Sequence, residues 1–258
     1  MDEVLPAPLA SCRSCILLRG LMHEAGHWHG FARHLSQAMP SHQCTMIDHP
    51  GVGTLLGVSA PWSIAAMADA ARARSGPGPH VLLATSLGSM VAAAWAHRYP
   101  ESVAGMILLV PSMRQAPLWA RLRPRAMGLM LLALARQRAP QVAYAVQRMT
   151  SNRGDDPEHR RIAAERICIA RRRPPQASVL LRQLWAAARF SLPPAPSCPV
   201  VVVTSAGDGM VHPACGRMWA KRWRCRHLQH PSAGHDLRID DAPWLLRQVQ
   251  NFLRNALP

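Results

Sequence analysis

Through most of the chain, short apolar runs alternate with longer segments in which apolar residues recur every three or four positions. The short runs have the length of buried strands, and the longer segments have the periodicity of amphipathic helices. We expect six strands, at residues 15–19, 44–48, 80–84, 105–110, 199–204 and 224–229. We expect helices at residues 28–38, 63–74, 87–97, 213–221 and 243–256. This alternation predicts an α/β fold with a mostly parallel, doubly wound sheet of about six strands.

The alternation stops between residues 111 and 196, where the chain is rich in Ala, Leu, Gln and Arg. Prolines divide this segment into several short helices; they stand at positions 117, 124, 140, 157, 174 and 175. The segment ends in Pro193-Pro194-Ala195-Pro196, which has the composition of a stiff linker. We therefore expect residues 111–196 to form a helical cap, inserted into a core that residues 1–110 and 197–258 build together.

The formal net charge of the 258 residues is +16, and it is distributed unevenly. Residues 111–195 hold 16 arginines against 4 acidic residues, and Lys221 is the only lysine of the chain. The arginines alternate with apolar residues, as they do on the outer faces of amphipathic helices, and this favours solvated helix faces. A surface for nucleic acid or an anionic membrane is the other interpretation of such a basic segment.

The cysteines and the N-terminal residues indicate a cytoplasmic protein. Seven scattered cysteines do not suit a complete disulfide framework, and the Cys12-x-x-Cys15 pair has no second pair to complete a zinc site. Reduced thiols are the simpler interpretation. The chain begins with Met1-Asp2-Glu3 and shows no secretory signal. Its longest nearly uncharged run, residues 81–96, is shorter than the roughly 20 residues that span a bilayer.

The segment Ala84-Thr85-Ser86-Leu87-Gly88 carries the strongest functional signal. It joins an expected strand directly to an expected helix, with a serine at the centre of the turn. Such a turn is so sharp that only small residues fit two positions before and two positions after the serine. Ala84 and Gly88 meet this requirement, so we expect Ser86 to be an exposed nucleophile at a nucleophile elbow.

A serine nucleophile needs a histidine to take its proton and a carboxylate to orient that histidine. Asp208 follows the fifth expected strand and His235 follows the sixth, so both lie at the sheet edge where sites of parallel sheets form. The order Ser86, Asp208, His235 is the order associated with this elbow. Alternatively, Asp208 only shapes a Gly-Asp-Gly turn. His212, His227 and His230 are rivals for the base, but none of them has the Gly-His loop context.

Acyl transfer also requires N–H donors for the developing oxyanion. The backbone N–H of Leu87, directly after the nucleophile, is the first expected donor. The second is expected from the loop after the first strand, where Gly20 lets the backbone turn. We assign it to Leu21, with Met22 as the next choice.

With these assignments, the chain resembles the α/β-hydrolase superfamily, and within it the compact bacterial carboxylesterase-like proteins with a helical lid. The matching pieces lie outside the expected cap: Arg19-Gly20-Leu21, Asp48-His49-Pro50-Gly51-Val52-Gly53, Ala84-Thr85-Ser86-Leu87-Gly88, Gly207-Asp208 and Gly234-His235. Most relatives have His where this chain has Arg19. The resemblance implies a structural role for Asp48, and the elbow serine argues against the haloalkane- and epoxide-cleaving branches, which use aspartate there.

The expected activity is a serine hydrolase acting on a small or medium acyl ester or thioester, with no metal or organic cofactor. Three histidines at 23, 27 and 29 lie on the oxyanion loop, but Glu24 is the only other nearby ligand and we do not expect a metal site. The apolar run 127–135 is expected to be a lid helix, with an acyl pocket or a membrane-facing lid as alternatives. The rival function is a basic adaptor that binds nucleic acid or anionic membrane through the cap, with little or no catalysis. The oligomeric state does not follow from the sequence.

Overall fold

The sheet has six strands, all parallel, in the order β2-β1-β3-β4-β5-β6. The computed structural model describes residues 14–135, 140–154, 156–174 and 176–256. The strands are β1 Ser14–Leu18, β2 Gln43–Ile47, β3 His80–Thr85, β4 Val103–Leu109, β5 Val200–Ser205 and β6 Arg226–His230. The two central strands, β3 and β4, are buried along their whole length, whereas β2 and β6 are partly exposed because they form the edges.

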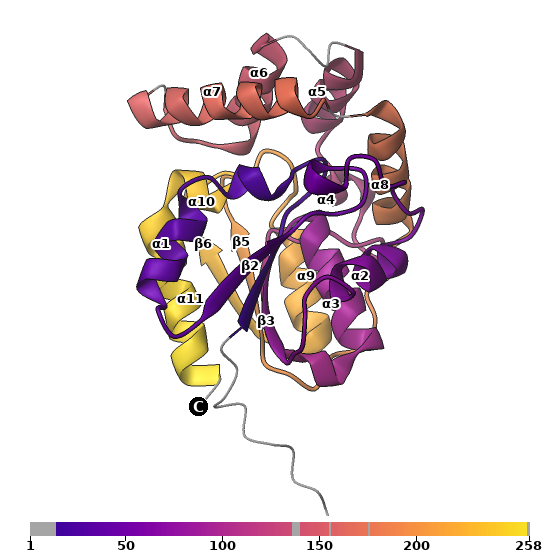
Figure 1. Cartoon of the computed structure of the whole chain (residues 1–258), viewed down its shortest axis with the longest axis vertical. Coiled ribbons are helices and arrows are strands. Elements are labelled where there is room, and N and C mark those ends of the chain that lie inside the picture. The colour runs from indigo at the N-terminus through magenta and orange to yellow at the C-terminus, as the bar shows by residue number, and fades with distance from the viewer. Residues whose placement is uncertain (1–13, 136–139, 155, 175, 257–258) are drawn as a thin grey trace, which may run out of the picture.

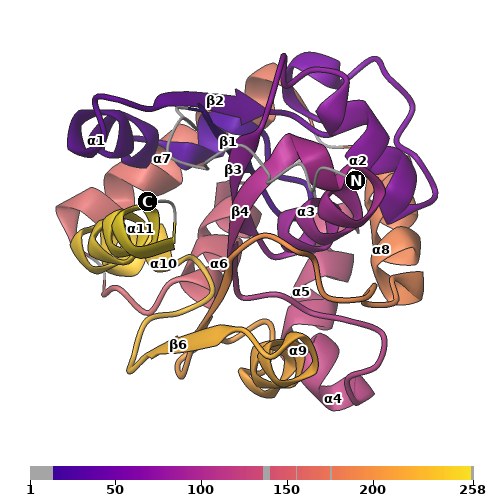
Figure 2. The same cartoon turned by 90° about the horizontal axis from the view of Figure 1, so that it is seen from below.

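Helices cover both faces of the sheet (Figure 1). One face carries α1 (Phe31–Ala38) and α11 (Ala242–Ala256), and the other carries α2 (Ile64–Arg72), α3 (Leu87–Arg98) and α9 (Ala214–Trp223). Seen from below, the two sets lie on opposite sides of the strands (Figure 2). This is the doubly wound arrangement that the sequence pattern predicts.

Alternate residues of each strand enter two separate cores. Leu82 and Ala84 of β3 pack with the α3 side, whereas Val81 and Leu83 pack with the α1 and α11 side. The same alternation holds along β4 and β5, because successive side chains of a strand point to opposite faces. Two cores sandwich the sheet, so its carboxyl edge is a rigid base for the loops that follow the strands.

Residues 111–196, between β4 and β5, form a group of helices that we call the insertion. Its helices are α4 Leu118–Arg121, α5 Pro124–Ala135, α6 Pro140–Thr150, α7 Pro157–Arg172 and α8 Ala177–Arg189. Figure 1 shows α5, α6 and α7 above the carboxyl ends of the strands, with α8 beside α2. Most arginines of the insertion are exposed, as expected, but Arg166 is 4% exposed and contradicts that expectation.

The strand predictions are confirmed with boundaries shifted by at most two residues, and the helix at 28–38 is the clearest error. There the chain forms a short 3₁₀ turn, Ala25–Trp28, and then breaks before α1. His29 has φ +48°, a left-handed conformation that a helix does not accept. Short helices at Gly53–Leu55, Pro100–Ser102 and α10 (Leu237–Asp240) were not predicted.

Two sequence-based expectations, on disulfides and on membrane spans, concern compartment rather than topology. No disulfide joins the six cysteines within the described residues, and Cys12 lies outside them. Over the part of the chain that the structure covers, no helix combines the length and apolarity needed to cross a bilayer.

The first turn of α3 tolerates only glycine at position 88. A Cβ atom on Gly88 would lie 2.6 Å from the Leu18 carbonyl oxygen and 2.7 Å from that of Arg19. Both atoms are backbone, so we expect Gly88→Ala to destabilise the fold by about 2 kcal/mol or more, measured by urea unfolding. Gly128→Ala is the matched control, because Gly128 lies in α5 with nothing near its Cβ position. The control substitution should raise the free energy of unfolding by up to about 1 kcal/mol. Equal effects of the two substitutions would contradict the close approach of Gly88 to the end of β1.

Candidate active site

The loops that follow β1, β3, β5 and β6 meet at the carboxyl edge of the sheet, beneath the insertion (Figure 1). They carry Arg19-Gly20-Leu21, Ser86, Asp208 and His235 respectively. Because all these strands are parallel, their carboxyl ends share one edge, which is where sites of such sheets form.

Ser86 stands alone at the tip of the turn between β3 and α3. Its backbone has φ +55° and ψ −118°, a strained conformation for a residue with a side chain. It is also the only residue between His80 and Ala96 that is not buried. Its N–H donates to the Leu109 carbonyl oxygen at 2.8 Å, which holds the turn against β4. The strained turn thus exposes the Ser86 hydroxyl, whereas the residues on either side of it are buried.

The loop after β1 lies directly against this serine. The Cβ position of Gly20 is 3.1 Å from the Ser86 Cβ and 3.6 Å from its Oγ. His49 is fully buried, and its Nε2 lies 3.0 Å from the carbonyl oxygen of Arg19, so it fixes the start of the loop. The Met22 N–H donates to Gln183 Oε1 of α8 at 2.8 Å.

The bond to Gln183 bears on the choice of oxyanion donors. It occupies the N–H of Met22, the second choice. In the described part of the chain, no protein acceptor takes the N–H of Leu21 or of Leu87. These two donors, which the sequence predicts, therefore remain available beside Ser86.

Asp208 and His235 form a buried pair. His235 Nδ1 lies 2.8 Å from Asp208 Oδ2, and the two residues are 8% and 2% exposed. The other oxygen of Asp208 accepts the N–H groups of Met210 and Val211 at 2.8 and 2.9 Å. The carboxylate is therefore fixed on both oxygens and can orient one imidazole.

No hydrogen bond joins the Ser86 hydroxyl to His235 among the described residues. The rival histidines have other partners. His227 Nε2 lies 2.9 Å from Thr204 Oγ1, and His230 Nδ1 accepts the Ala233 N–H at 2.8 Å. His212 Nδ1 accepts the Ala214 N–H at 3.2 Å. Only His235 pairs with Asp208.

The insertion fastens the loops that carry this pair. Asn152, between α6 and α7, donates through Nδ2 to the carbonyl oxygens of Gly207 and Ser232, each at 2.9 Å. The Asp236 N–H donates to the Thr150 carbonyl oxygen at 2.7 Å. The sequence analysis did not identify Asn152 or Gln183, because neither carries a motif and both act only through folded contacts.

A cavity of about 580 Å³ opens beside Ser86. Its walls come from the core and from α4, α5 and α8, and they are mainly apolar. The residues that line it include Leu21, Ser86, Trp119, Met127, Ala187 and Val211. The insertion therefore supplies much of the wall of the space that the hydroxyl faces.

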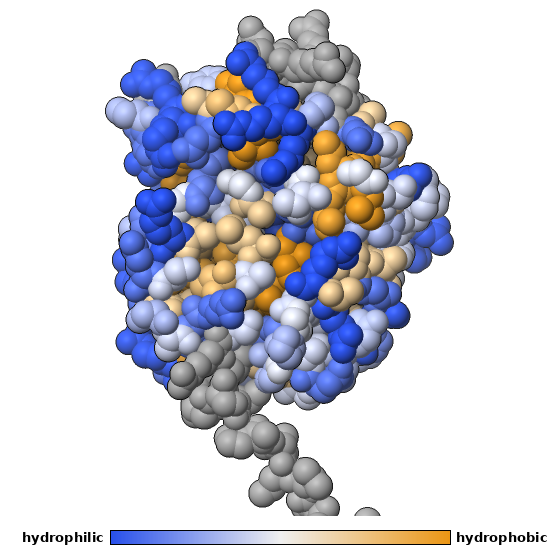
Figure 3. Space-filling view, viewed as in Figure 1, coloured by the Kyte–Doolittle hydropathy of each residue, from blue (hydrophilic) through white to orange (hydrophobic). Residues whose placement is uncertain are grey.

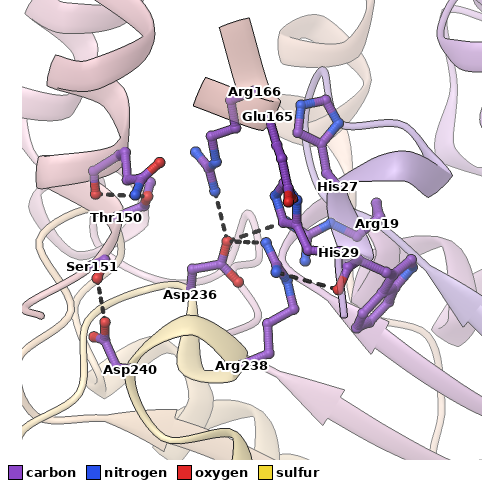
Figure 4. A network of polar contacts seen from close by, with 12 residues as sticks. Arg19, His27, His29, Thr150, Ser151, Glu165, Arg166, Asp236, Arg238 and Asp240 are labelled. Atoms are coloured by element: carbon purple, nitrogen blue, oxygen red, sulfur yellow. Dashed lines mark hydrogen bonds and ion pairs between the residues drawn. The ribbon is translucent and has the colours of Figure 1, made fainter. Parts of the chain in front are cut away.

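Asp236, the residue after His235, is surrounded by three arginines (Figure 4), and all four side chains are buried. The Oδ2 atom of Asp236 accepts Nη2 of Arg238 at 2.7 Å, of Arg166 at 2.8 Å and of Arg19 at 3.4 Å. Burial acts to raise the pKa of Asp236, but Arg238, Arg19 and Arg166 together hold that pKa below its ordinary value. Burial lowers the pKa of Arg166 to about 10, although Asp236 opposes the shift.

The histidines considered as metal ligands are packed on one another instead. The rings of His23 and His27 make an edge contact with centroids 4.6 Å apart, and His27 Nδ1 accepts the Glu24 N–H at 3.1 Å. His29 Nδ1 lies 2.5 Å from Glu165 of α7. Across the described segments, no three His, Cys, Asp or Glu side chains are placed to hold a metal ion.

The role implied for Asp48 agrees with its contacts. Its carboxylate accepts the Thr54 N–H at 2.8 Å and the Thr54 hydroxyl at 2.9 Å, as well as the Ala25 N–H at 2.5 Å. Gly53, at φ +57°, leaves no space for a Cβ atom beside that carboxylate. Asp48 therefore shapes the turn and braces the neighbouring loop.

Comparisons with known proteins show the family and the fold. The sequence matches the family model of the alpha/beta hydrolase fold over residues 16–242. A thermophilic esterase from Thermogutta terrifontis superposes with a TM-score of 0.74 at 21% identity, covering 95% of this chain and 90% of its own. A proposed non-heme bromoperoxidase from Mycobacterium tuberculosis has a TM-score of 0.74 at 19% identity, covering 96% and 94%.

A lipase-esterase related protein from Clostridium acetobutylicum has a TM-score of 0.66 at 12% identity, covering 93% of each chain. At these identities the likeness shows the fold alone. A comparison with curated protein sequences finds no match.

The buried histidines make stability depend on pH. Burial lowers the pKa of His27 and of His49 in the folded chain, whereas in the unfolded chain each titrates near 6.5. Below that pH the unfolded state binds more protons, so stability present at pH 7.5 is lost as the pH falls. Each histidine that stays neutral contributes up to about 2 kcal/mol of this loss at pH 5.

Urea unfolding between pH 7.5 and 5.0 measures this loss. His27→Gln should flatten the dependence, because glutamine still accepts the Glu24 N–H but does not titrate. The exposed His97→Gln should not flatten it. Identical slopes for the two variants would contradict the assignment.

Proposed function

The chain belongs to the alpha/beta hydrolase fold family, and within that family we propose that it is a serine hydrolase cleaving a small or medium acyl ester or thioester. One observation carries the proposal. The strained, partly exposed Ser86 faces an apolar cavity at the sheet edge where Asp208 holds His235 at 2.8 Å. These are the parts that acyl transfer needs, in the chain order of this fold.

In the proposed first step, the Ser86 hydroxyl attacks the acyl carbonyl carbon while His235 Nε2 takes its proton. This requires the two side chains to approach each other when substrate binds, because no hydrogen bond joins them in the structure. Asp208 keeps the proton on Nδ1 and stabilises the imidazolium. The negative charge that develops on the carbonyl oxygen is stabilised by the N–H groups of Leu87 and Leu21.

The tetrahedral intermediate then collapses. The bond to the leaving alcohol or thiol breaks, His235 gives that group its proton, and the acyl group stays on Ser86. Water enters, loses a proton to His235, and attacks the same carbonyl carbon. Collapse of the second intermediate returns the proton to Ser86 and releases the carboxylic acid. Every group in this sequence comes from the chain, the substrate or water.

The insertion acts as the cap in this proposal, with the division at residues 111–196 that the sequence suggests. Trp119, Met127 and Ala187 line the cavity and belong to it. A volume of about 580 Å³ with mainly apolar walls suits an acyl chain of small or medium length. A reducing, cytoplasmic setting is also part of the proposal, and the absence of disulfides among the described cysteines supports it.

Replacement of the nucleophile tests the mechanism. Ser86→Ala should lower kcat for p-nitrophenyl butyrate by roughly 10⁴-fold or more and abolish labelling by a fluorophosphonate probe. Asp208→Asn should lower kcat by a similar factor. The control Ser178→Ala changes an exposed serine of α8, and it should leave both kcat and the labelling by the probe unchanged.

Labelling of the Ser86→Ala protein would refute the assignment of the nucleophile. If the unaltered protein is not labelled but binds duplex DNA or anionic vesicles in a salt-dependent way, the basic adaptor is the correct function.

A substitution in the cavity wall tests the acyl pocket. Ala187→Phe places a phenyl ring in the cavity, so kcat/KM should fall steeply for p-nitrophenyl octanoate and little for the acetate. The control is Ala177→Phe, at an exposed position of the same helix that does not line the cavity. A chain-length profile from acetate to dodecanoate measures the effect. An unchanged profile in the Ala187→Phe protein would show that the acyl group binds elsewhere.

A further inference from the structure

Three arginines from three separate segments converge on one carboxylate beneath the insertion. Arg19 comes from the loop after β1, Arg166 descends from α7, and Arg238 rises from α10 (Figure 4). Their exposed fractions are 4%, 4% and 6%, and that of Asp236 is 6%. The cluster therefore places three positive charges and one negative charge out of contact with bulk water.

The guanidinium groups of this cluster have fewer hydrogen-bond acceptors than they have buried donors. All three guanidinium groups share the single Oδ2 atom of Asp236. The Nε atoms of all three are buried and have no hydrogen-bond partner. Arg238 finds one further acceptor, the Trp28 carbonyl oxygen at 3.5 Å, and the Trp28 ring lies under Arg19.

Other acidic groups nearby are committed elsewhere. Glu165 of α7 pairs with His29 and with Arg161 on the helix surface. Asp208 pairs with His235. His23 and His27 are held neutral, because burial lowers their pKa and the neighbouring arginines lower it further. Among the described residues, Asp236 is thus the one acid that is hydrogen-bonded to the three buried guanidinium groups.

Buried charges are normally paired, since an uncompensated charge in a protein interior is costly. A cluster of three cations and one anion keeps a net positive charge, and some of its guanidinium N–H donors have no acceptor. Arginine donors in a fixed fork suit the oxygens of a carboxylate or a phosphate. A second oxyanion, that is, a carboxylate or phosphate group bound in addition to the Asp236 carboxylate, would supply both the missing negative charge and the missing acceptors.

We propose that Arg19, Arg166 and Arg238 form a binding subsite for a second oxyanion, a carboxylate or phosphate group, beside the candidate catalytic His235. Asp236 directly follows His235, and Arg19 directly precedes Gly20 of the oxyanion loop. None of the four cluster residues lines the apolar cavity. In Figure 1, α7 covers the sheet edge near α1 and α10, whereas α4 and α8 lie toward α2. The oxyanion is either a free anion or the charged group of an anionic ester.

Binding of inorganic phosphate and of succinate tests the subsite without any assumption about catalysis. At constant ionic strength, with chloride as the reference, both anions should raise the Tm of the unaltered protein saturably. Isothermal titration should give an affinity that falls about tenfold in Arg166→Gln, since a charge-assisted hydrogen bond is lost. Arg172→Gln, an exposed arginine of the same helix, should bind as the unaltered protein does.

Absence of saturable binding to the unaltered protein would overturn the proposal, as would equal affinity in the two variants. If Arg166→Gln does not fold, crystals of the unaltered protein grown with phosphate decide the question. An anion within hydrogen-bonding distance of Arg166 and Arg19 supports the subsite. An anion found only on exposed arginines contradicts it.

A second experiment identifies the source of the anion, and this part rests on the proposed function. The substrates p-nitrophenyl hemisuccinate and p-nitrophenyl butyrate differ mainly in one carboxylate. If the subsite holds the substrate, kcat/KM favours the hemisuccinate, and Arg166→Gln lowers the ratio of the hemisuccinate kcat/KM to the butyrate kcat/KM about tenfold. If phosphate binds but the preference is absent, the subsite holds a free anion. Loss of all esterase activity would leave the phosphate result standing.

Discussion

The approach of the first turn of α3 to the end of β1 sets the geometry of the candidate site. Gly88 lies so close to the carbonyl oxygens of Leu18 and Arg19 that no side chain fits between them. That contact forces the sharp turn at Ser86, gives the serine its positive φ, and brings Gly20 against it. Strain in the turn persists because the two cores and the hydrogen bond from Ser86 to β4 hold every neighbouring residue in place.

The insertion does more than cover this edge. Gln183 holds the loop after β1, Asn152 bridges the loops that carry Asp208 and His235, and Arg166 reaches the carboxylate next to His235. Each contact satisfies a polar group of a loop that would otherwise depend on water. Because these contacts come from three separate positions in the insertion, its placement and the geometry of the site are coupled. A displacement of α7 or α8 would change the loops directly.

The sequence predicted the sheet and the order of the candidate catalytic groups, because both depend on local patterns. A buried strand reads as a short apolar run, and a Gly-His or Gly-Asp pair after it marks a loop at the carboxyl edge. It did not predict the break at His29, since packing among the rings of His23, His27 and His29 overrides the helical pattern there. It also did not predict that Arg166 is buried, because the other arginines of α7 are exposed and arginine is rarely fully buried unless it is paired.

Arg19 connects these observations, because the family resemblance leads us to expect histidine at its position. At that position the backbone carbonyl is held by His49, so the loop after β1 keeps its support while the Arg19 side chain turns toward Asp236. A long cationic side chain there draws charge into the interior and requires anionic partners, of which the described residues offer one. Ser86 consequently lies where an apolar cavity and a buried cationic cluster adjoin one edge of the sheet. Two such unlike environments favour a substrate with an apolar part and a charged part over a uniformly apolar one.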